Sequence, residues 1–325
     1  MNTIEGRAWH VLSGARGVGA KTLWKIADFL ASRNQTASWL LQHCGEIDVV
    51  LEMKKAGIVI PGFKKNEYGE LEKFANRQVT VLHPLHADFP PRLRALKDMS
   101  SLPAILYVRG NIAILNRPAV AIVGMRQAVE AALAAAAALA AEAAASGVTI
   151  VSGYAAGIDT AAHLAALRSK GTTAMVLPEG IHHFQTRPEL LDHLTIDNIL
   201  VISQFEPDAK WAAYMAMTRN KLVGALSEAM VVVVSGPRRD ADGRMSGSFD
   251  AGMSALKMGI PVFVVSPHFF TDPPEGNRQL IARGCRAWDP AAGAAPIIEA
   301  LRSHADHKLS KQLDLFEKEE DESVL

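Results

Sequence analysis

Four short segments of the sequence carry residues of the kinds that bind phosphate, namely glycine, small hydroxyl residues, arginine and lysine. These segments are Gly124-Met125-Arg126, Ser152-Gly153, Arg219-Asn220-Lys221 and Ser246-Gly247-Ser248. Backbone amides at the start of a helix form hydrogen bonds with phosphate, and a guanidinium group matches the geometry of a phosphate group. The segments are far apart in the chain, so they form one site only if the fold brings them together.

The stretch from residue 120 to 163 predicts the structural unit that would place the first two segments. Val120–Val123 is a short apolar run typical of a buried parallel strand, and the alanine-rich stretch Ala128–Ala145 predicts a helix. Val148–Val151 predicts the next strand, and Gly157 allows a turn into the following helix. A strand, a helix and a parallel strand form a βαβ unit, which places ligands at the carboxyl ends of its strands.

Further apolar runs extend this unit to a larger sheet. Strands are predicted at 79–82, 102–110, 171–177, 198–203, 229–234 and 262–265. We expect the strand at 102–110 to lie at the edge of the sheet, with Pro103 at its start. Arg219-Asn220-Lys221 is expected at the start of a helix. The predicted fold class is α/β, with a mostly parallel sheet flanked by helices.

The first 75 residues predict short helices. Gly14, Gly17 and Gly19 fall between two helical stretches, and Lys21 lies in the first turn of the second. This pattern resembles a helix-hairpin-helix motif, whose loop amides bind a DNA phosphate. Under that interpretation, secondary contacts with DNA would come from Arg16, Gly17, Gly19 and Lys21. A plain glycine turn in a small helical domain is the alternative.

Composition limits the class of protein. The chain has 325 residues, 49% of them hydrophobic, and its 34 basic and 34 acidic residues give a formal net charge of zero. Any affinity for a polyanion must therefore come from local patches rather than from bulk charge. Cys44 and Cys285 lack the spacing of a zinc site or a disulfide framework. No signal-like amino terminus and no apolar run of about 20 residues are present, so we expect a soluble, cytoplasmic protein without a membrane segment.

Catalytic and metal chemistry find little support in the sequence. His182 and His183 are adjacent, but no third or fourth ligand with suitable spacing accompanies them. Asp159, Glu179 and Asp250 are candidate acids, and none has a partner that the sequence identifies. We predict no catalytic residue, no metal and no cofactor, and hence a protein that is not an enzyme.

The motif Ser152-Gly153-x-Ala155-x-Gly157-Ile158-Asp159-x-x-Ala162-His163 resembles the signature of the DprA/Smf DNA-processing proteins. Other blocks similar to this family follow its order along the chain, over about residues 80 to 290. They include Leu106-Tyr107-Val108-Arg109-Gly110, Gly124-Met125-Arg126, Arg219-Asn220-Lys221, Ser246-Gly247-Ser248 and Gly276-Asn277. The order of separated blocks is more specific than any one of them.

The resemblance implies an extended Rossmann-like sheet and a non-catalytic protein that binds single-stranded DNA. Such a protein protects the strand or hands it to a RecA-type recombinase, in transformation or recombination, and it is commonly a homodimer. Affinity would come from phosphate neutralisation in a basic pocket. The contacts implied are Gly124, Arg126, Ser152, Gly153, Gly157, Arg219, Asn220, Lys221, Ser246, Gly247 and Ser248. In the loop before Ser246, Arg238, Arg239 and Arg244 would either add secondary contacts with a polyanion or pair with Asp240 and Asp242.

The chain divides into three predicted parts. Residues 1–78 would form a small all-α domain of the helix-hairpin-helix or SAM-like type, and residues 79–301 a Rossmann-like domain. Residues 302–325 are highly charged and predict a disordered tail. Many members of the resembled family carry a winged-helix-like carboxyl domain, and we expect none in this chain.

Departures from the family pattern leave two other functions open. Glu179 adds negative charge near the expected ligand, Lys221 replaces an arginine, and the loop at 235–247 is altered. A Rossmann-type sensor of a nucleotide-derived ligand, as in anti-phage defence, is the first alternative. A nucleotide phosphoribohydrolase-like enzyme is the second, and it is disfavoured because the Pro-Gly-Gly-x-Gly-Thr loop of those enzymes is absent.

Overall fold

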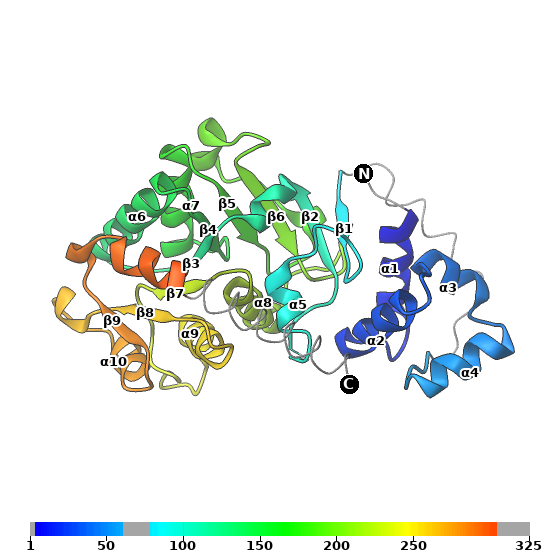
Figure 1. Cartoon of the computed structure of the whole chain (residues 1–325). Helices are drawn as coiled ribbons and strands as arrows, with labels where there is room; N and C mark the ends of the chain where they lie inside the picture. The colour runs from blue at the N-terminus through cyan, green and yellow to red at the C-terminus, as the bar shows by residue number, and fades with distance from the viewer. Residues whose placement is uncertain (1–3, 61–77, 100, 304–325) are drawn as a thin grey trace, which may run out of the picture.

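The computed structural model describes residues 4–60, 78–99 and 101–303, which are organised around one nine-stranded sheet (Figure 1). The strand order is β1-β2-β6-β5-β4-β3-β7-β8-β9. β2 is antiparallel to both of its neighbours, and all other neighbouring strands of this sheet are parallel. The strands are β1 (Thr80–Leu82), β2 (Leu106–Gly110), β3 (Ala119–Val123), β4 (Thr149–Ser152), β5 (Thr173–Val176), β6 (Ile199–Ser203), β7 (Ala229–Val232), β8 (Val262–Val265) and β9 (Arg286–Trp288).

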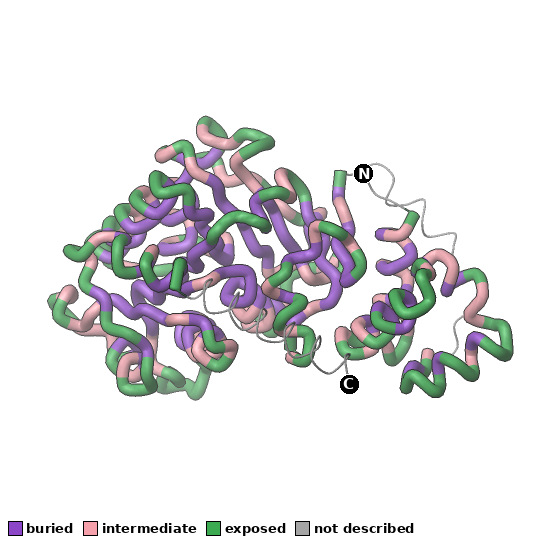
Figure 2. Tube along the Cα trace, viewed as in Figure 1, coloured by how far each residue is buried: buried purple, intermediate pink, exposed green. Residues whose placement is uncertain are grey.

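The sheet is buried on both faces, because alternate residues of a strand point to opposite sides and each side is covered. In β3, Ala119, Ala121 and Val123 belong to one hydrophobic core, and Val120 and Ile122 belong to the other. This explains why the strands read as continuous apolar runs. In Figure 2 the buried strands run through the larger, left-hand part of the molecule, with exposed loops around them.

Helices cover the two faces. α6, α7 and a helical segment at 295–303 pack on one face, and α5, α8, α9 and α10 pack on the other (Figure 1). The small side chains of α6 let it approach the sheet and α7 closely. These helices are α5 (Pro91–Ala95), α6 (Glu130–Ala145), α7 (Ile158–Arg168), α8 (Ala213–Ala225), α9 (Gly247–Lys257) and α10 (Glu275–Ile281).

Four short helices precede the sheet, namely α1 (Ile4–Gly14), α2 (Ala20–Ala31), α3 (Ala37–His43) and α4 (Ile47–Lys55). Their buried residues share a hydrophobic core with β1, β2 and β6. Trp9 stacks on His83 with ring centroids 5.2 Å apart, and Nδ1 of His10 is 2.7 Å from the hydroxyl of Tyr107. These ring contacts join α1 directly to the sheet.

The predicted fold class is confirmed, with one correction. The strand at 102–110 was expected at the sheet edge, but β2 lies between β1 and β6, and β1 is the edge strand. The division into 1–78, 79–301 and 302–325 stays a prediction, and residues 304–325 of the predicted tail lie outside the described residues. Within the described ranges, no helix is long and apolar enough to cross a membrane.

Two buried histidines make the stability of this fold depend on pH. Burial lowers the pKa of both His83 and His163 to about 3. The unfolded chain binds protons at histidine near pH ~6.5, so below that pH the unfolded state binds more protons than the folded state. The stability contributed by the two neutral rings is complete above this pH and is lost as the pH falls toward the folded-state pKa.

We expect the free energy of unfolding to decrease by about 1.4 kcal/mol per histidine between about pH 7.5 and pH 5.5. Urea unfolding at the two pH values measures this decrease. The variant His83→Asn has no ring to protonate at this position. Its free energy of unfolding should therefore decrease by about 1.4 kcal/mol less than that of the wild type. A wild-type chain that is equally stable at both pH values would contradict the prediction.

Candidate functional site

A cavity of about 690 Å³ lies beyond the carboxyl ends of β3 and β7, where the strand order reverses. From β3 the chain builds β4, β5 and β6 on one side, and it then crosses through α8 to β7 on the other side. Ligands of open parallel sheets bind at such switch points. The walls come from residues 123–127 at the end of β3, from Ala155 and Asp159 after β4, from parts of 211–220 in and before α8, and from parts of 244–251 at the start of α9.

The loop after β4 folds around the carboxylate of Asp159, in the first turn of α7. Oδ2 of Asp159 accepts hydrogen bonds from the backbone amides of Gly153 and Ala155, both at 3.2 Å. Gly157 has a φ of 79°, and a Cβ there would lie 2.3 Å from the carbonyl oxygen of Arg126. Only glycine fits this position, and the tight turn that results brings the loop after β3 against the loop after β4.

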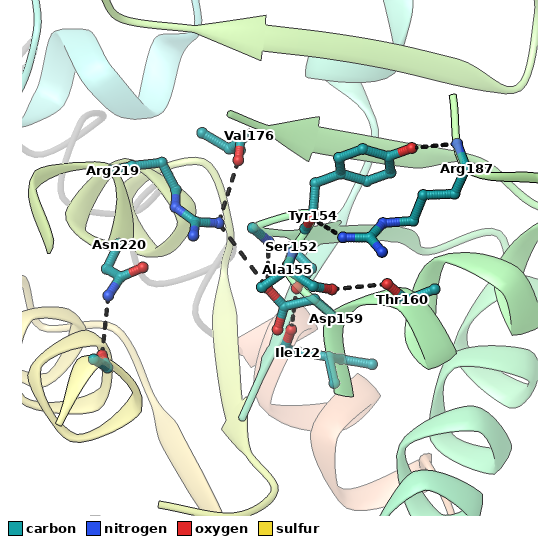
Figure 3. A network of polar contacts seen from close by, with 12 residues as sticks. Ile122, Ser152, Tyr154, Ala155, Asp159, Thr160, Val176, Arg187, Arg219 and Asn220 are labelled. Atoms are coloured by element: carbon teal, nitrogen blue, oxygen red, sulfur yellow. Dashed lines mark hydrogen bonds and ion pairs between the residues drawn. The ribbon is translucent and has the colours of Figure 1, made fainter. Parts of the chain in front are cut away.

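Tyr154 holds the same loop from its other side (Figure 3). Its backbone is left-handed, with a φ of 56°, a conformation that tyrosine rarely adopts. The Tyr154 hydroxyl donates to the carbonyl of Gln185 at 3.0 Å and accepts from the amide of Arg187 at 2.8 Å. The Arg187 guanidinium lies 5.0 Å from the ring centroid and donates to the Tyr154 carbonyl at 3.2 Å. These bonds stabilise the strained conformation.

Arg219 of α8 is the ionic partner of Asp159. Its Nη1 is 4.0 Å from Oδ2 of Asp159 and donates to the carbonyl oxygen of Val176 at 3.2 Å (Figure 3). The two side chains are 6% and 7% exposed. A Cβ on Gly153 would lie 1.3 Å from Nη1, so glycine at 153 provides the space that the guanidinium occupies. Nε of Arg219 is buried and has no hydrogen-bond partner among the described residues.

Burial acts in opposite directions on the two members of this pair. It raises the pKa of the Asp159 carboxyl, and the charge of Arg219 lowers it. It lowers the pKa of the Arg219 guanidinium, which Asp159 raises and the nearby charge of Arg126 lowers further. Each buried charge is therefore tolerated because the other is present.

The amino terminus of α9 forms the opposite wall. The Ser246 hydroxyl accepts from the amide of Phe249 and so caps the helix. Nδ2 of Asn220 donates to the carbonyl of Gly247 at 3.0 Å, which ties α8 to α9 (Figure 3). The start of a helix carries a partial positive charge, so this wall favours a negative ligand.

Carboxylates lie close to several cations around the cavity. Nη1 of Arg244 is 3.0 Å from Oδ2 of Asp242. Burial raises the pKa of Asp250, in the first turn of α9, and the positive charges of Lys221 and Lys257 lower it. Arg126 is exposed and has no ion pair with any described residue.

The cavity unites most of the predicted site residues. Its lining includes Gly124, Arg126, Arg219, Asn220, Ser246, Gly247, Ser248 and, from the secondary set, Arg244. Ser152, Gly153, Gly157 and Lys221 are not part of the lining. The Ser152 hydroxyl is buried and donates to the carbonyl of Ile122 at 2.6 Å, so it supports the sheet from behind the cavity.

The other secondary candidates lie outside the cavity. Arg238 and Arg239 are exposed in the loop before α9, where Nη1 of Arg239 donates to the carbonyl of Gly243. Arg16, Gly17 and Gly19 are exposed between α1 and α2, and Lys21 is exposed in the first turn of α2. None of these four residues lines the cavity.

The expected helix start at Arg219 is wrong. α8 begins at Ala213, so Arg219 lies in its middle, on the buried face with Met215, Leu222 and Val223. This spacing of four, three and one residues is that of a single helix face. Arg219 therefore points at the sheet, and its neighbour Asn220 reaches the open part of the cavity.

The sequence analysis missed the apolar part of the cavity. Trp211, Met125 and Met245 line it and are 51%, 38% and 41% exposed, and Met217 lies beside them. The one available signal was a tryptophan just before a helix, next to Lys210 in a polar stretch. Large apolar side chains that stay exposed around a cavity are typical of a binding surface.

Comparisons with known proteins match most of the chain. The family model described as DNA recombination-mediator protein A matches residues 80–300. The DNA processing protein DprA of Bacillus subtilis is 32% identical over 195 residues, which are 59% of this chain and 63% of that protein. Protein Smf of Escherichia coli is 31% identical over 284 residues, 86% of this chain and 72% of that protein.

Two solved structures resemble the whole fold or the sheet region. DNA processing protein A from Streptococcus pneumoniae has a TM-score of 0.68 at 21% identity and covers 92% of this chain and 98% of its own, a likeness that concerns the fold. DNA processing protein A from Helicobacter pylori, known for its single-stranded DNA binding mode, has a TM-score of 0.55 at 27% identity over 69% of this chain and 97% of its own. The chain spans less than two thirds of the length of the B. subtilis protein.

The buried pair leads to a prediction about stability. Asp159→Asn leaves the charge of Arg219 buried without a partner, so we expect a loss of about 3–5 kcal/mol in the free energy of unfolding. Asp159→Asn combined with Arg219→Met removes both charges and should recover part of this loss. Urea unfolding measures both effects.

Asp197→Asn is the matched control for this series, because Asp197 is an exposed aspartate outside the cavity. Asp197→Asn should change the free energy of unfolding by no more than about 0.5 kcal/mol. If Asp159→Asn were no more destabilising than Asp197→Asn, the pair would not be the structural element described above.

Proposed function

Because the chain belongs to the DprA/Smf family, whose model is that of DNA recombination-mediator protein A, we propose that it binds single-stranded DNA in the switch-point cavity. The bound strand is protected there or passed to a RecA-type recombinase. The protein acts as a homodimer, as inferred from the family resemblance. The sequence motifs had predicted this family, and the match over residues 80–300 confirms that prediction.

The observation that carries the proposal is the meeting of amides and cations at one edge of the sheet. Arg126 and Arg244 are exposed in the cavity lining, Arg126 has no ion pair with a described residue, and the start of α9 supplies a partial positive charge. These groups suit a sugar-phosphate chain, because phosphates accept hydrogen bonds from guanidinium groups and from helix amides. The H. pylori relative, similar over 69% of this chain, is itself a single-stranded DNA-binding protein.

The apolar lining supplies a place for bases. Trp211 is half exposed at the cavity, with Met125 and Met245 nearby in its lining. Proteins that hold single strands combine a cationic groove with aromatic rings on which the bases stack, and each stacked base contributes about 1–3 kcal/mol. We therefore assign the phosphates to the Arg126 side of the cavity and a stacked base to Trp211.

We propose binding rather than catalysis as the activity of the site. Among the described residues that line the cavity, Asp159 is the one carboxylate, and it is occupied by two backbone amides and by Arg219. A general acid or base must be able to exchange a proton with a ligand. Among the described residues, no cluster of three or more metal-ligating side chains occurs.

A small nucleotide-derived ligand is the second candidate, and the cavity size favours it. About 690 Å³ lies within the usual range for small-molecule sites. Thermal melts with free nucleotides, run beside binding assays with oligo-dT, separate the two functions. Stabilisation by nucleotides without oligo-dT binding would replace the proposed function with that of a sensor.

Arg126→Ala tests the phosphate contact. We expect weaker binding of oligo-dT and a salt dependence of log K that is shallower by about 0.7, the value for one lost phosphate contact on a single strand. Fluorescence anisotropy at several salt concentrations measures both quantities. Arg168→Ala is the control, since Arg168 is an exposed arginine of α7 outside the cavity.

Lys221→Ala should weaken binding less than Arg126→Ala, because Lys221 is outside the lining and close to Asp250. Equal binding by the wild type, Arg126→Ala and Lys221→Ala would exclude the cavity as the DNA site.

Trp211→Ala tests the base contact. Loss of one stacked base should weaken oligo-dT binding by roughly tenfold, with the salt dependence unchanged, since stacking releases no counterions. Trp211→Phe retains a ring and should retain most of the affinity. If Trp211→Ala changed the salt dependence of log K for oligo-dT, Trp211 would have a role other than stacking on a base.

A further inference from the structure

The cations at the cavity differ in how strongly a carboxylate of the same chain occupies them. Arg219 is paired with Asp159 inside the protein, where the two side chains are 6% and 7% exposed. Arg244 is paired with Asp242 at the rim, where they are 78% and 67% exposed. Arg126 has no such partner among the described residues. Of these two ion pairs between described residues, the rim pair is the one that a ligand can reach.

The loop that carries this rim pair is fixed by a different residue. Oδ1 of Asp240 accepts hydrogen bonds from the backbone amides of Asp242 and Arg244, at 3.0 and 2.8 Å. The carboxylate of Asp242 makes its contact with Nη1 of Arg244, at 3.0 Å. Asp240 therefore shapes the turn, whereas the side chain of Asp242 occupies the guanidinium of Arg244.

We propose that Asp242 is an internal competitor of DNA, a carboxylate that stands in for a phosphate on Arg244 and thereby sets the affinity of the site. This inference rests on the proposed binding of single-stranded DNA. A carboxylate and a phosphodiester both accept hydrogen bonds from a guanidinium group. An incoming phosphate therefore competes with Asp242 for Arg244, and a displaced carboxylate stays beside the polyanion and repels it.

The exposure of the pair determines the size of the effect. Exposed ion pairs are weak, so a phosphate can displace Asp242 at little cost. We expect Asp242→Asn to tighten oligo-dT binding by about two- to fivefold at about 50 mM salt, the change that corresponds to such a pair. The gain should shrink as salt is added, because salt screens exposed charges. The salt dependence of log K should become steeper by up to about 0.7.

A double-mutant cycle shows whether the effect passes through Arg244. In the Arg244→Ala background, Asp242→Asn should change oligo-dT affinity much less than it does in the wild type, because the cation for which Asp242 competes is gone. An unchanged gain in that background would mean that Asp242 acts only as a diffuse negative charge, and it would overturn the inference.

Two single variants serve as controls. Asp242→Glu keeps the carboxylate and should bind oligo-dT as the wild type does. Asp197→Asn removes an equal charge from an exposed position outside the cavity and should leave affinity unchanged. Equal gains in oligo-dT affinity from Asp197→Asn and Asp242→Asn would also reject the proposed competition between Asp242 and DNA.

The outcomes for the two proposals are distinct. If the wild type and Asp242→Asn both fail to bind oligo-dT, the proposed function is wrong. If the wild type binds and Asp242→Asn binds equally well, the proposed function stands and the competition between Asp242 and DNA is rejected. Asp242 and Arg244 lie on an exposed turn, so circular dichroism should show the same fold for the wild type and for every variant.

Discussion

The ion pair between Asp159 and Arg219 is the constraint on which the rest of the site depends. It joins the start of α7 to the middle of α8, two helices that belong to opposite faces of the sheet. The carboxylate also fixes the loop after β4 through two backbone amides. Two buried charges require full mutual compensation, so the positions of α7, α8 and this loop are determined together. Gly153 belongs to the same constraint, because any side chain there would occupy the place of the guanidinium.

The topology of the sheet explains why a cavity forms beside this pair. The chain leaves β3 toward β4 and returns on its other side at β7, so the loops after β3 and β7 diverge and cannot fill the space between them. α8 crosses back over the sheet and brings Arg219 and Asn220 to this space, and Asn220 closes one wall through its bond to Gly247. A chain of zero net charge can thus present local positive charge, since the fold gathers cations from three separate segments.

Much of this arrangement could be predicted from the sequence, because its causes are local. Continuous apolar runs between glycine turns indicated the strands from β3 to β8, and the alanine-rich stretch Ala128–Ala145 indicated α6. The orientation of Arg219 was not recognised, although Met215, Leu222 and Val223 share its helix face and carried the signal. The antiparallel insertion of β2 and the apolar lining at Trp211 could not be obtained this way. Both depend on which distant segments become neighbours, and periodicity says nothing about that.

Two arginine–aspartate pairs have different roles in this protein, because one pair is buried and the other is exposed. Inside the protein, desolvation makes each charge intolerable without the other, so the Asp159–Arg219 pair is permanent and acts as structure. At the rim, water solvates both partners of the Asp242–Arg244 pair, so exchanging one partner for a phosphate changes the free energy little. Burial, not residue type, therefore decides which arginine builds the cavity and which is available to a ligand. Under the proposed function, Arg126, which is exposed and has no ion pair with a described residue, is the position where a strand would meet no internal competitor and where binding would begin.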